Sequence, residues 1–166
     1  MTRCIVELAL VGVLGAAFAA GAEDKACGLL TAAELESAVG GKVSGLSGSG
    51  LTGANAHICT GHTPTATVVL RMGTRSASDG KESGKASKGI EMVRKMGVQV
   101  DVKTFGPVTC STMIPPKNLE QYGFNTTCSV VKGATVAAIE VGAKAQKDMV
   151  SIDKLRPLAE KMASRF

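Results

Sequence analysis

The chain has 166 residues, the size of one ordinary domain. It contains no Trp, one Tyr and four Phe, so its hydrophobic core must be built mainly from aliphatic side chains and Met. The formal net charge of +5 permits an anionic partner without requiring one. Because no aromatic residues are interleaved with the basic ones and no nucleic-acid-binding motif is present, we expect no nucleic-acid partner.

The first 22 residues have the pattern of an export signal. A short polar start with Arg3 precedes an apolar run from Leu8 to Ala20, and Ala20-Gly21-Ala22 has the small-x-small form of a cleavage site. We therefore expect a signal peptide over residues 1–22 and a single disulfide-stapled α+β domain over residues 23–166. The alternative is an uncleaved membrane anchor over residues 5–22, which is just long enough to span a bilayer.

The number of cysteines supports export. Removal of the signal takes Cys4 with it and leaves an even set of four, which allows three disulfide connectivities. Two of them, Cys110 and Cys128, lie equidistant from Leu119, so an antiparallel pairing about the intervening loop would set them opposite each other. We expect the disulfides Cys110–Cys128 and Cys27–Cys59, each stabilising the domain by roughly 3 kcal/mol.

The first half of the expected domain contains one helix and one clear strand. The helix begins at a capping box formed by Thr31 and Glu34 and ends at Gly40-Gly41. Residues 42–56 are rich in Gly and Ser and are interpreted as a loop or a weak edge strand. Residues 65–72 are rich in β-branched side chains and are predicted to form a strand.

The second half is predicted to form a helix, four strands and a closing helix. Residues 82–96 place Ile90, Val93 and Met96 at helical spacing, and residues 98–102 alternate apolar and polar side chains as a strand does. A three-strand meander follows over residues 105–143, with Lys132-Gly133 as its tight turn. Residues 152–165 form an amphipathic helix. The predicted fold is therefore α+β, with an antiparallel sheet of about five strands, helices mainly on one face, and two disulfides.

A candidate metal site lies around the second cysteine of the expected domain. His57, Cys59 and His62 are three possible ligands within six residues, and imidazole with thiolate suits copper or zinc. This interpretation needs a reduced Cys59, which the expected disulfide with Cys27 would prevent. We therefore expect no bound cofactor, and keep metal binding as the alternative function.

Two surfaces are candidates for contact with a partner. The first is the hairpin loop, where stiff prolines lie beside apolar residues, namely Ile114, Pro115, Pro116, Leu119 and Tyr122. The second is the basic side of the helix over residues 82–96 and its entry, which is suited to an anionic surface. Its members are Lys81, Lys85, Lys88, Arg94 and Lys95. Either set can equally be an ordinary part of the molecular surface.

No catalytic pattern is visible. The two histidines lie beside an expected disulfide, and there is no Gly-x-Ser-x-Gly nucleophile motif. We therefore expect a protein that is not an enzyme. A second alternative is an enzyme whose carboxylates come together only in the fold, with Asp101, Glu120 and Glu140 as candidates.

The segment Cys27-Gly-Leu-Leu-Thr31-Ala-Ala-Glu34 resembles the opening of small bacterial secreted and lipoprotein domains of unknown function. Those domains begin with a Cys-x-Leu-Leu-Thr-x-x-Glu helix, carry a second cysteine before the first strand, and close with an amphipathic helix. Members are often lipidated at the first cysteine; here Asp24-Lys25-Ala26 precedes Cys27, where a lipidation site requires small and apolar residues. The resemblance implies a helix-and-sheet domain facing the cell envelope, with no catalytic residues to carry over.

These observations predict an exported, non-enzymatic binding or accessory protein of the bacterial cell envelope. We expect it to be periplasmic or secreted. Its partner would be an envelope protein or a small ligand, and it would meet the membrane only transiently, through the signal peptide.

Overall fold

The computed structural model describes residues 25–51, 56–74 and 82–166. The expected signal peptide and Lys81 lie outside these residues. Within the described ranges, no helix is both long and apolar enough to cross a membrane.

Seven strands form one antiparallel sheet in the order β1-β2-β3-β7-β6-β5-β4. The sheet consists of two meanders, and they meet where β3 pairs with β7 over nine residue pairs. The strands are β1 (Ser44–Leu51), β2 (Ala56–His62), β3 (Ala66–Thr74), β4 (Gln99–Phe105), β5 (Val108–Ile114), β6 (Phe124–Lys132) and β7 (Thr135–Ala143).

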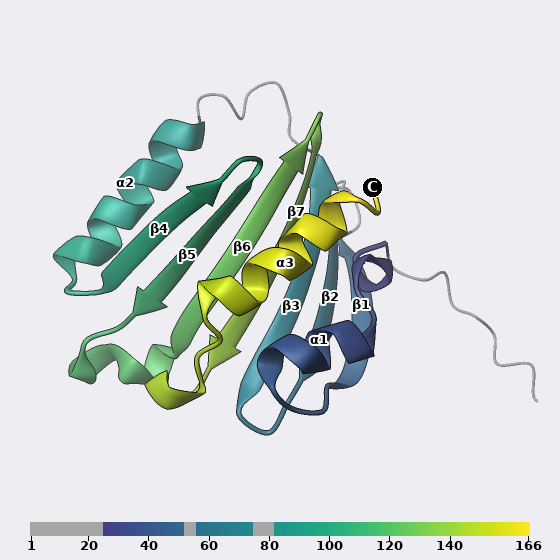
Figure 1. Cartoon of the computed structure of the whole chain (residues 1–166). Coiled ribbons are helices and arrows are strands. Elements are labelled where there is room, and N and C mark those ends of the chain that lie inside the picture. The colour runs from purple at the N-terminus through teal and green to yellow at the C-terminus, as the bar shows by residue number, and fades with distance from the viewer. Residues whose placement is uncertain (1–24, 52–55, 75–81) are drawn as a thin grey trace, which may run out of the picture.

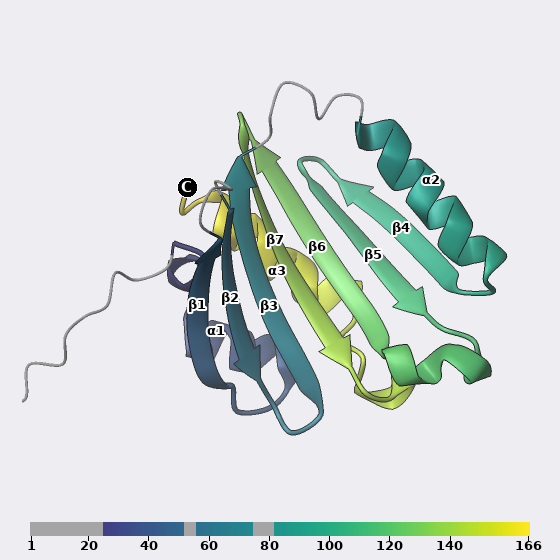
Figure 2. The same cartoon turned by 180° about the vertical axis from the view of Figure 1, so that it is seen from behind.

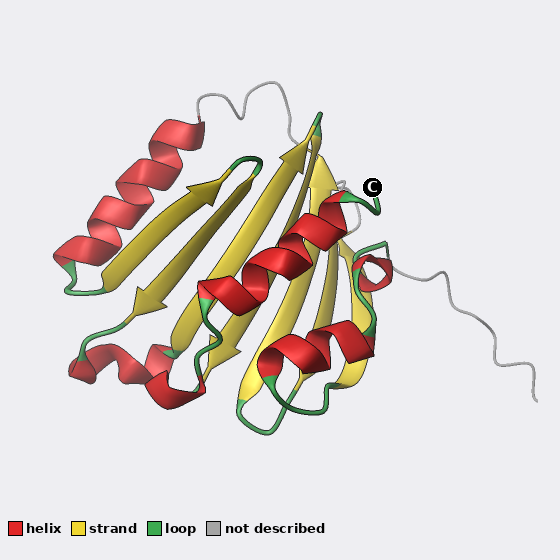
Figure 3. Cartoon of the chain, in the orientation of Figure 1, coloured by secondary structure: helices red, strands yellow, loops and turns green. Residues whose placement is uncertain are grey.

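Two helices cover one face of this sheet (Figure 1). The helix α3 (Ile152–Ala163) packs on β5, β6 and β7, and α1 (Ala32–Val39) lies beside it. A third helix, α2 (Glu82–Lys95), lies along the outer edge next to β4. Figure 2 looks onto the opposite face, which no helix of the described chain covers. Three short 3-10 helices connect these elements (Figure 3): η1 (Cys27–Leu29), η3 (Lys117–Tyr122) and η4 (Gln146–Asp148).

The prediction of about five strands is therefore wrong. Residues 42–56 were left open as a loop or a weak edge strand and contain the edge strand β1, and β2 was not predicted. Gly and Ser have low strand propensity, so the composition of residues 44–51 gave little signal. These residues are ordered by pairing with β2, which in turn pairs with β3. Gly61 lies in β2, where a Cβ would be 2.9 Å from Val43 Cγ1, so its missing side chain allows close packing of the chain that leads into β1.

The strands bury one face because their side chains alternate between the two sides of the sheet. In β3, Val68 and Leu70 are fully buried, and Ile139 of β7 lies directly opposite Leu70. Leu155 and Met162 of α3 are also fully buried and belong to the same hydrophobic core. The core is thus aliphatic, as the composition required.

Both expected disulfides are confirmed. Cys110 of β5 faces Cys128 of β6 in the predicted register, with a Cα–Cα distance of 4.0 Å. Cys27 of η1 is bonded to Cys59 of β2. Disulfides persist in oxidising compartments, so the two bonds indicate a protein that works outside the cytoplasm.

Removal of the central disulfide should lower stability without changing the sheet. We expect the double variant Cys110→Ala/Cys128→Ala to lose about 3 kcal/mol of unfolding free energy, because the unfolded chain is no longer cross-linked. Urea denaturation followed by far-ultraviolet circular dichroism measures this loss. The matched control is the parent protein with and without reductant: an unchanged midpoint in the double variant would contradict the prediction.

Candidate functional site

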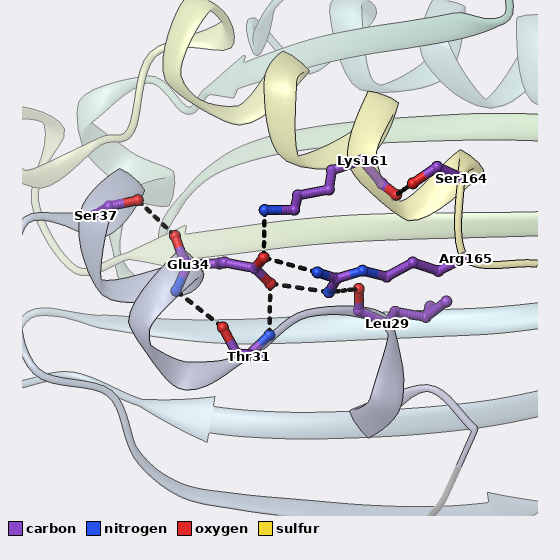
Figure 4. Close-up of polar contacts among 7 residues, drawn as sticks. All are labelled: Leu29, Thr31, Glu34, Ser37, Lys161, Ser164 and Arg165. Atoms are coloured by element: carbon purple, nitrogen blue, oxygen red, sulfur yellow. Dashed lines mark hydrogen bonds and ion pairs between the residues drawn. The ribbon is translucent and has the colours of Figure 1, made fainter.

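One carboxylate in the described chain has a strongly shifted pKa. Glu34 lies at the start of α1, where its carboxylate accepts a hydrogen bond from the Thr31 backbone N–H at 2.8 Å and its own N–H donates to Thr31 Oγ1. This is the predicted capping box. The same carboxylate also contacts Arg165 and Lys161 at the far end of the chain (Figure 4). We call these four residues the Glu34 cluster.

The contacts of the Glu34 cluster explain the pKa shift. Arg165 donates two hydrogen bonds to the two carboxylate oxygens, at 2.9 and 2.7 Å, and Lys161 Nζ lies 2.5 Å from Oε1. Chiefly the Arg165 guanidinium, and then Lys161 and the Thr31 amide, hold the pKa of Glu34 well below its usual range. The same ion pair raises the pKa of Arg165.

We interpret the Glu34 cluster as structural. Its carboxylate is fully ionised and saturated with donors, so it is poorly suited to act as a general acid or base near neutral pH. Arg165 Nη1 also donates to the Leu29 carbonyl oxygen at 2.7 Å, which joins the end of the chain to η1. The cluster therefore fixes α1 and η1 to the C-terminal end of α3.

A different region has the character of a binding site. A pocket of about 200 Å³ opens between the end of α2, the 3-10 helix η3 and the uncovered face of β5 and β6. We call it the α2–η3 pocket. It is lined by Val93, Met96, Val98, Met113, Pro115, Leu119, Tyr122, Gly123 and Asn125.

Local conformation explains how these segments meet. Gly97 has φ +85°, which allows the chain to turn sharply from α2 into β4. Pro116 packs near this turn, since a Cβ on Gly97 would lie 3.5 Å from Pro116 Cγ. Gly123 has φ +82° and ends η3, where its N–H donates to the Glu120 carbonyl oxygen. These two turns bring α2 and η3 to the same end of the sheet.

One residue that lines the pocket has a buried polar atom with no partner among the described residues. Asn125 Oδ1 is buried and accepts no hydrogen bond from any described residue. Buried polar atoms are nearly always hydrogen-bonded, since an unpaired one loses its interaction with water. This oxygen lies next to β7, since a Cβ on Gly142 would be 3.3 Å from it.

The predicted contact loop contributes part of this pocket. Pro115, Leu119 and Tyr122 line it, whereas Ile114 and Pro116 are half-buried and do not. The sequence did not indicate the contribution of α2. The sequence placed Met96 at helical spacing with Ile90 and Val93, which are half-buried, whereas the Met96 side chain is 56% exposed.

The three candidate metal ligands do not meet. Cys59 is bonded to Cys27 and has no free thiolate. Residues of opposite parity in a strand point to opposite faces, so His57 lies on the face of Cys59 and His62 lies on the other. No group of three potential ligands comes together anywhere in the described ranges.

The three candidate carboxylates also lie apart. Asp101 is on the edge strand β4, with its carboxylate 3.6 Å from Lys103 Nζ. Glu120 lies in η3, and Glu140 lies in β7, where it forms an ion pair with Arg71 at 3.0 Å.

The candidate basic residues are only partly described. Lys88, Arg94 and Lys95 are exposed on α2; nothing is described of the Lys85 side chain. Arg94 also donates a hydrogen bond to the Val100 carbonyl oxygen of β4 at 3.0 Å.

Comparison with family models, curated proteins and solved structures finds no match to this chain. The case for a function therefore depends on the geometry of the chain itself.

The Glu34 cluster should make the free energy of unfolding depend on pH. Because the folded-state pKa of Glu34 is lowered, its stabilisation is complete above the unfolded value of about 4.3 and is lost as the pH falls below it. We expect Glu34→Gln to reduce the difference in unfolding free energy between pH 7 and pH about 3, as measured by urea denaturation.

Two variants serve as controls for this prediction. Thr31→Ala should cost about 1 kcal/mol through loss of the helix cap. Glu160→Gln removes an exposed ion pair with Arg156 within α3 and should have little effect. If Glu34→Gln keeps the full acid dependence of the parent, the proposed role of the Glu34 cluster is wrong.

Proposed function

We propose that the chain is an exported, non-enzymatic binding or accessory protein of the bacterial cell envelope, and that it binds through the α2–η3 pocket. The observation that carries this proposal is a pocket lined almost wholly by apolar side chains, two of which remain exposed at its mouth. Met96 is 56% exposed and Tyr122 is 78% exposed. Apolar groups left in water at a concave site favour a partner that covers them.

The size of the pocket limits what can enter it. Sites that enclose a small molecule usually measure about 300–1,000 Å³. At about 200 Å³, this pocket suits one apolar group of a larger partner, such as a side chain or the end of a hydrocarbon chain.

Several features together support the proposed cellular compartment of the protein. The two disulfides favour an oxidising compartment. The signal-like residues 1–22 favour export, and the resemblance to envelope domains favours a periplasmic or secreted protein. That the chain is not an enzyme is part of the proposal. The candidate carboxylates among the described residues lie on separate elements, and the two histidines point to opposite faces of β2, which supports it.

A neutral apolar fluorophore tests the site. We expect N-phenyl-1-naphthylamine to bind the protein with a rise in fluorescence, because it carries an apolar ring system and no charge. The double variant Met96→Ser/Tyr122→Ser should weaken this binding by roughly fivefold or more, since it removes two of the exposed apolar contacts. Both side chains are exposed, so the variant should keep the parent's circular dichroism spectrum and thermal midpoint.

Val102→Ser is the matched control. Val102 is also an exposed apolar residue, on the neighbouring strand β4, but it does not line the pocket. Its variant should bind the fluorophore as the parent does. Equal binding by the parent and the double variant, or no binding by the parent, would refute the proposed site.

A further inference from the structure

The large exposed hydrophobic side chains gather in one region of the molecule. Among the described residues these are Met92, Met96, Val102 and Tyr122, with exposures of 67%, 56%, 40% and 78%. Met92 lies on α2 and Met96 directly after it, Val102 lies on β4, and Tyr122 lies in η3. These elements lie at the same side of the sheet (Figures 1 and 2). We call these four residues the exposed apolar patch. Its concentration on one side is typical of an interaction surface.

Basic residues lie within the same surface. Lys88 lies four residues before Met92, and Lys95 and Met96 lie three and four residues after it, so the four residues share one side of the helix and its end. Ile90 and Val93 are half-buried on the other side. The solvent side of α2 therefore alternates lysines with methionines.

The anchoring of α2 keeps this side exposed. Arg94 donates to the carbonyl oxygen of Val100 on the edge strand, and Val93 lines the pocket together with Val98. These contacts hold one side of the helix against β4. The side with Lys88, Met92 and Lys95 is left to face outward. Met96 lies between this side and Val93, and it also lines the pocket.

We infer that the α2 surface and the α2–η3 pocket dock onto an anionic lipid bilayer. This inference rests on the proposed function, because it names the partner of the same pocket. Lysines attract anionic headgroups, while methionine and tyrosine side chains enter the boundary between headgroups and hydrocarbon. Lysine stems can extend along apolar surface and keep their charge among the headgroups.

The charge of this surface favours an anionic bilayer over a neutral one. Lys88, Arg94 and Lys95 on α2 outnumber its one exposed acidic residue in the described part, Glu91. An apolar protein partner would use the exposed apolar patch but would not need the lysines. The membrane contact inferred here is made by the folded domain, unlike the transient contact that was expected from the signal peptide alone.

Vesicle binding tests the inference. The protein recovered from its export compartment is sedimented with phosphatidylcholine vesicles and with vesicles that contain about one quarter phosphatidylglycerol. We expect binding to the anionic vesicles only, and we expect raised salt to weaken it. The double variant Lys88→Gln/Lys95→Gln should bind roughly 25-fold more weakly, at about fivefold for each lysine near the surface.

The charge-matched control is Lys42→Gln/Lys154→Gln. Both lysines are exposed and lie away from α2, before β1 and on α3 respectively. This control changes the net charge equally and should bind as the parent does. Equal losses in the two double variants would show that net charge alone acts, and would overturn the inference.

The apolar contribution is tested separately with Met92→Ser, which leaves the pocket lining and all charges intact. We expect about fivefold weaker vesicle binding, and unchanged binding of N-phenyl-1-naphthylamine. If the parent binds the fluorophore but neither type of vesicle, the pocket remains a binding site and the lipid inference is overturned. If it binds neither, both proposals fail.

Discussion

Much of the structure depends on the register of β5 and β6, which is reinforced by the disulfide between Cys110 and Cys128. The disulfide joins directly opposite residues of β5 and β6, and both cysteines are fully buried in the hydrophobic core. A slip of one residue between two strands would send every side chain to the wrong face. The bond prevents that slip. The register determines which residues meet α3 and which remain on the uncovered face.

The candidate site is a consequence of the same register. Three residue pairs along from the disulfide, Met113 faces Asn125, on the opposite side of the sheet. These two residues form the part of the pocket that belongs to the sheet, while α2 and η3 supply the rest. Because α2 is held against an edge strand by Arg94, the pocket combines a rigid side with a helix that has few other contacts. Binding sites commonly combine these two features.

Prediction from the sequence succeeded where the signal was local. The capping box of Thr31 and Glu34 and the left-handed Gly40 concern adjacent residues, and the symmetry about Leu119 gave the central disulfide. It failed where order comes from partners far along the chain. The strand β1 is ordered by pairing with β2, and Glu34 meets Arg165 across 131 positions. The contact loop indicated part of the pocket, whereas the helical spacing of Met96 did not indicate that its side chain is exposed.

Because the core is aliphatic, the exposed Tyr122 dominates the intrinsic fluorescence of the protein. The chain has no Trp and no other Tyr, so its near-ultraviolet fluorescence comes almost entirely from one phenol ring at the pocket. A partner that covers this ring would change the emission of the unlabelled protein. Unfolding of the core, by contrast, would change it little, because Tyr122 is already 78% exposed in the folded state. Intrinsic fluorescence is thus a built-in probe of the site and a poor probe of the fold.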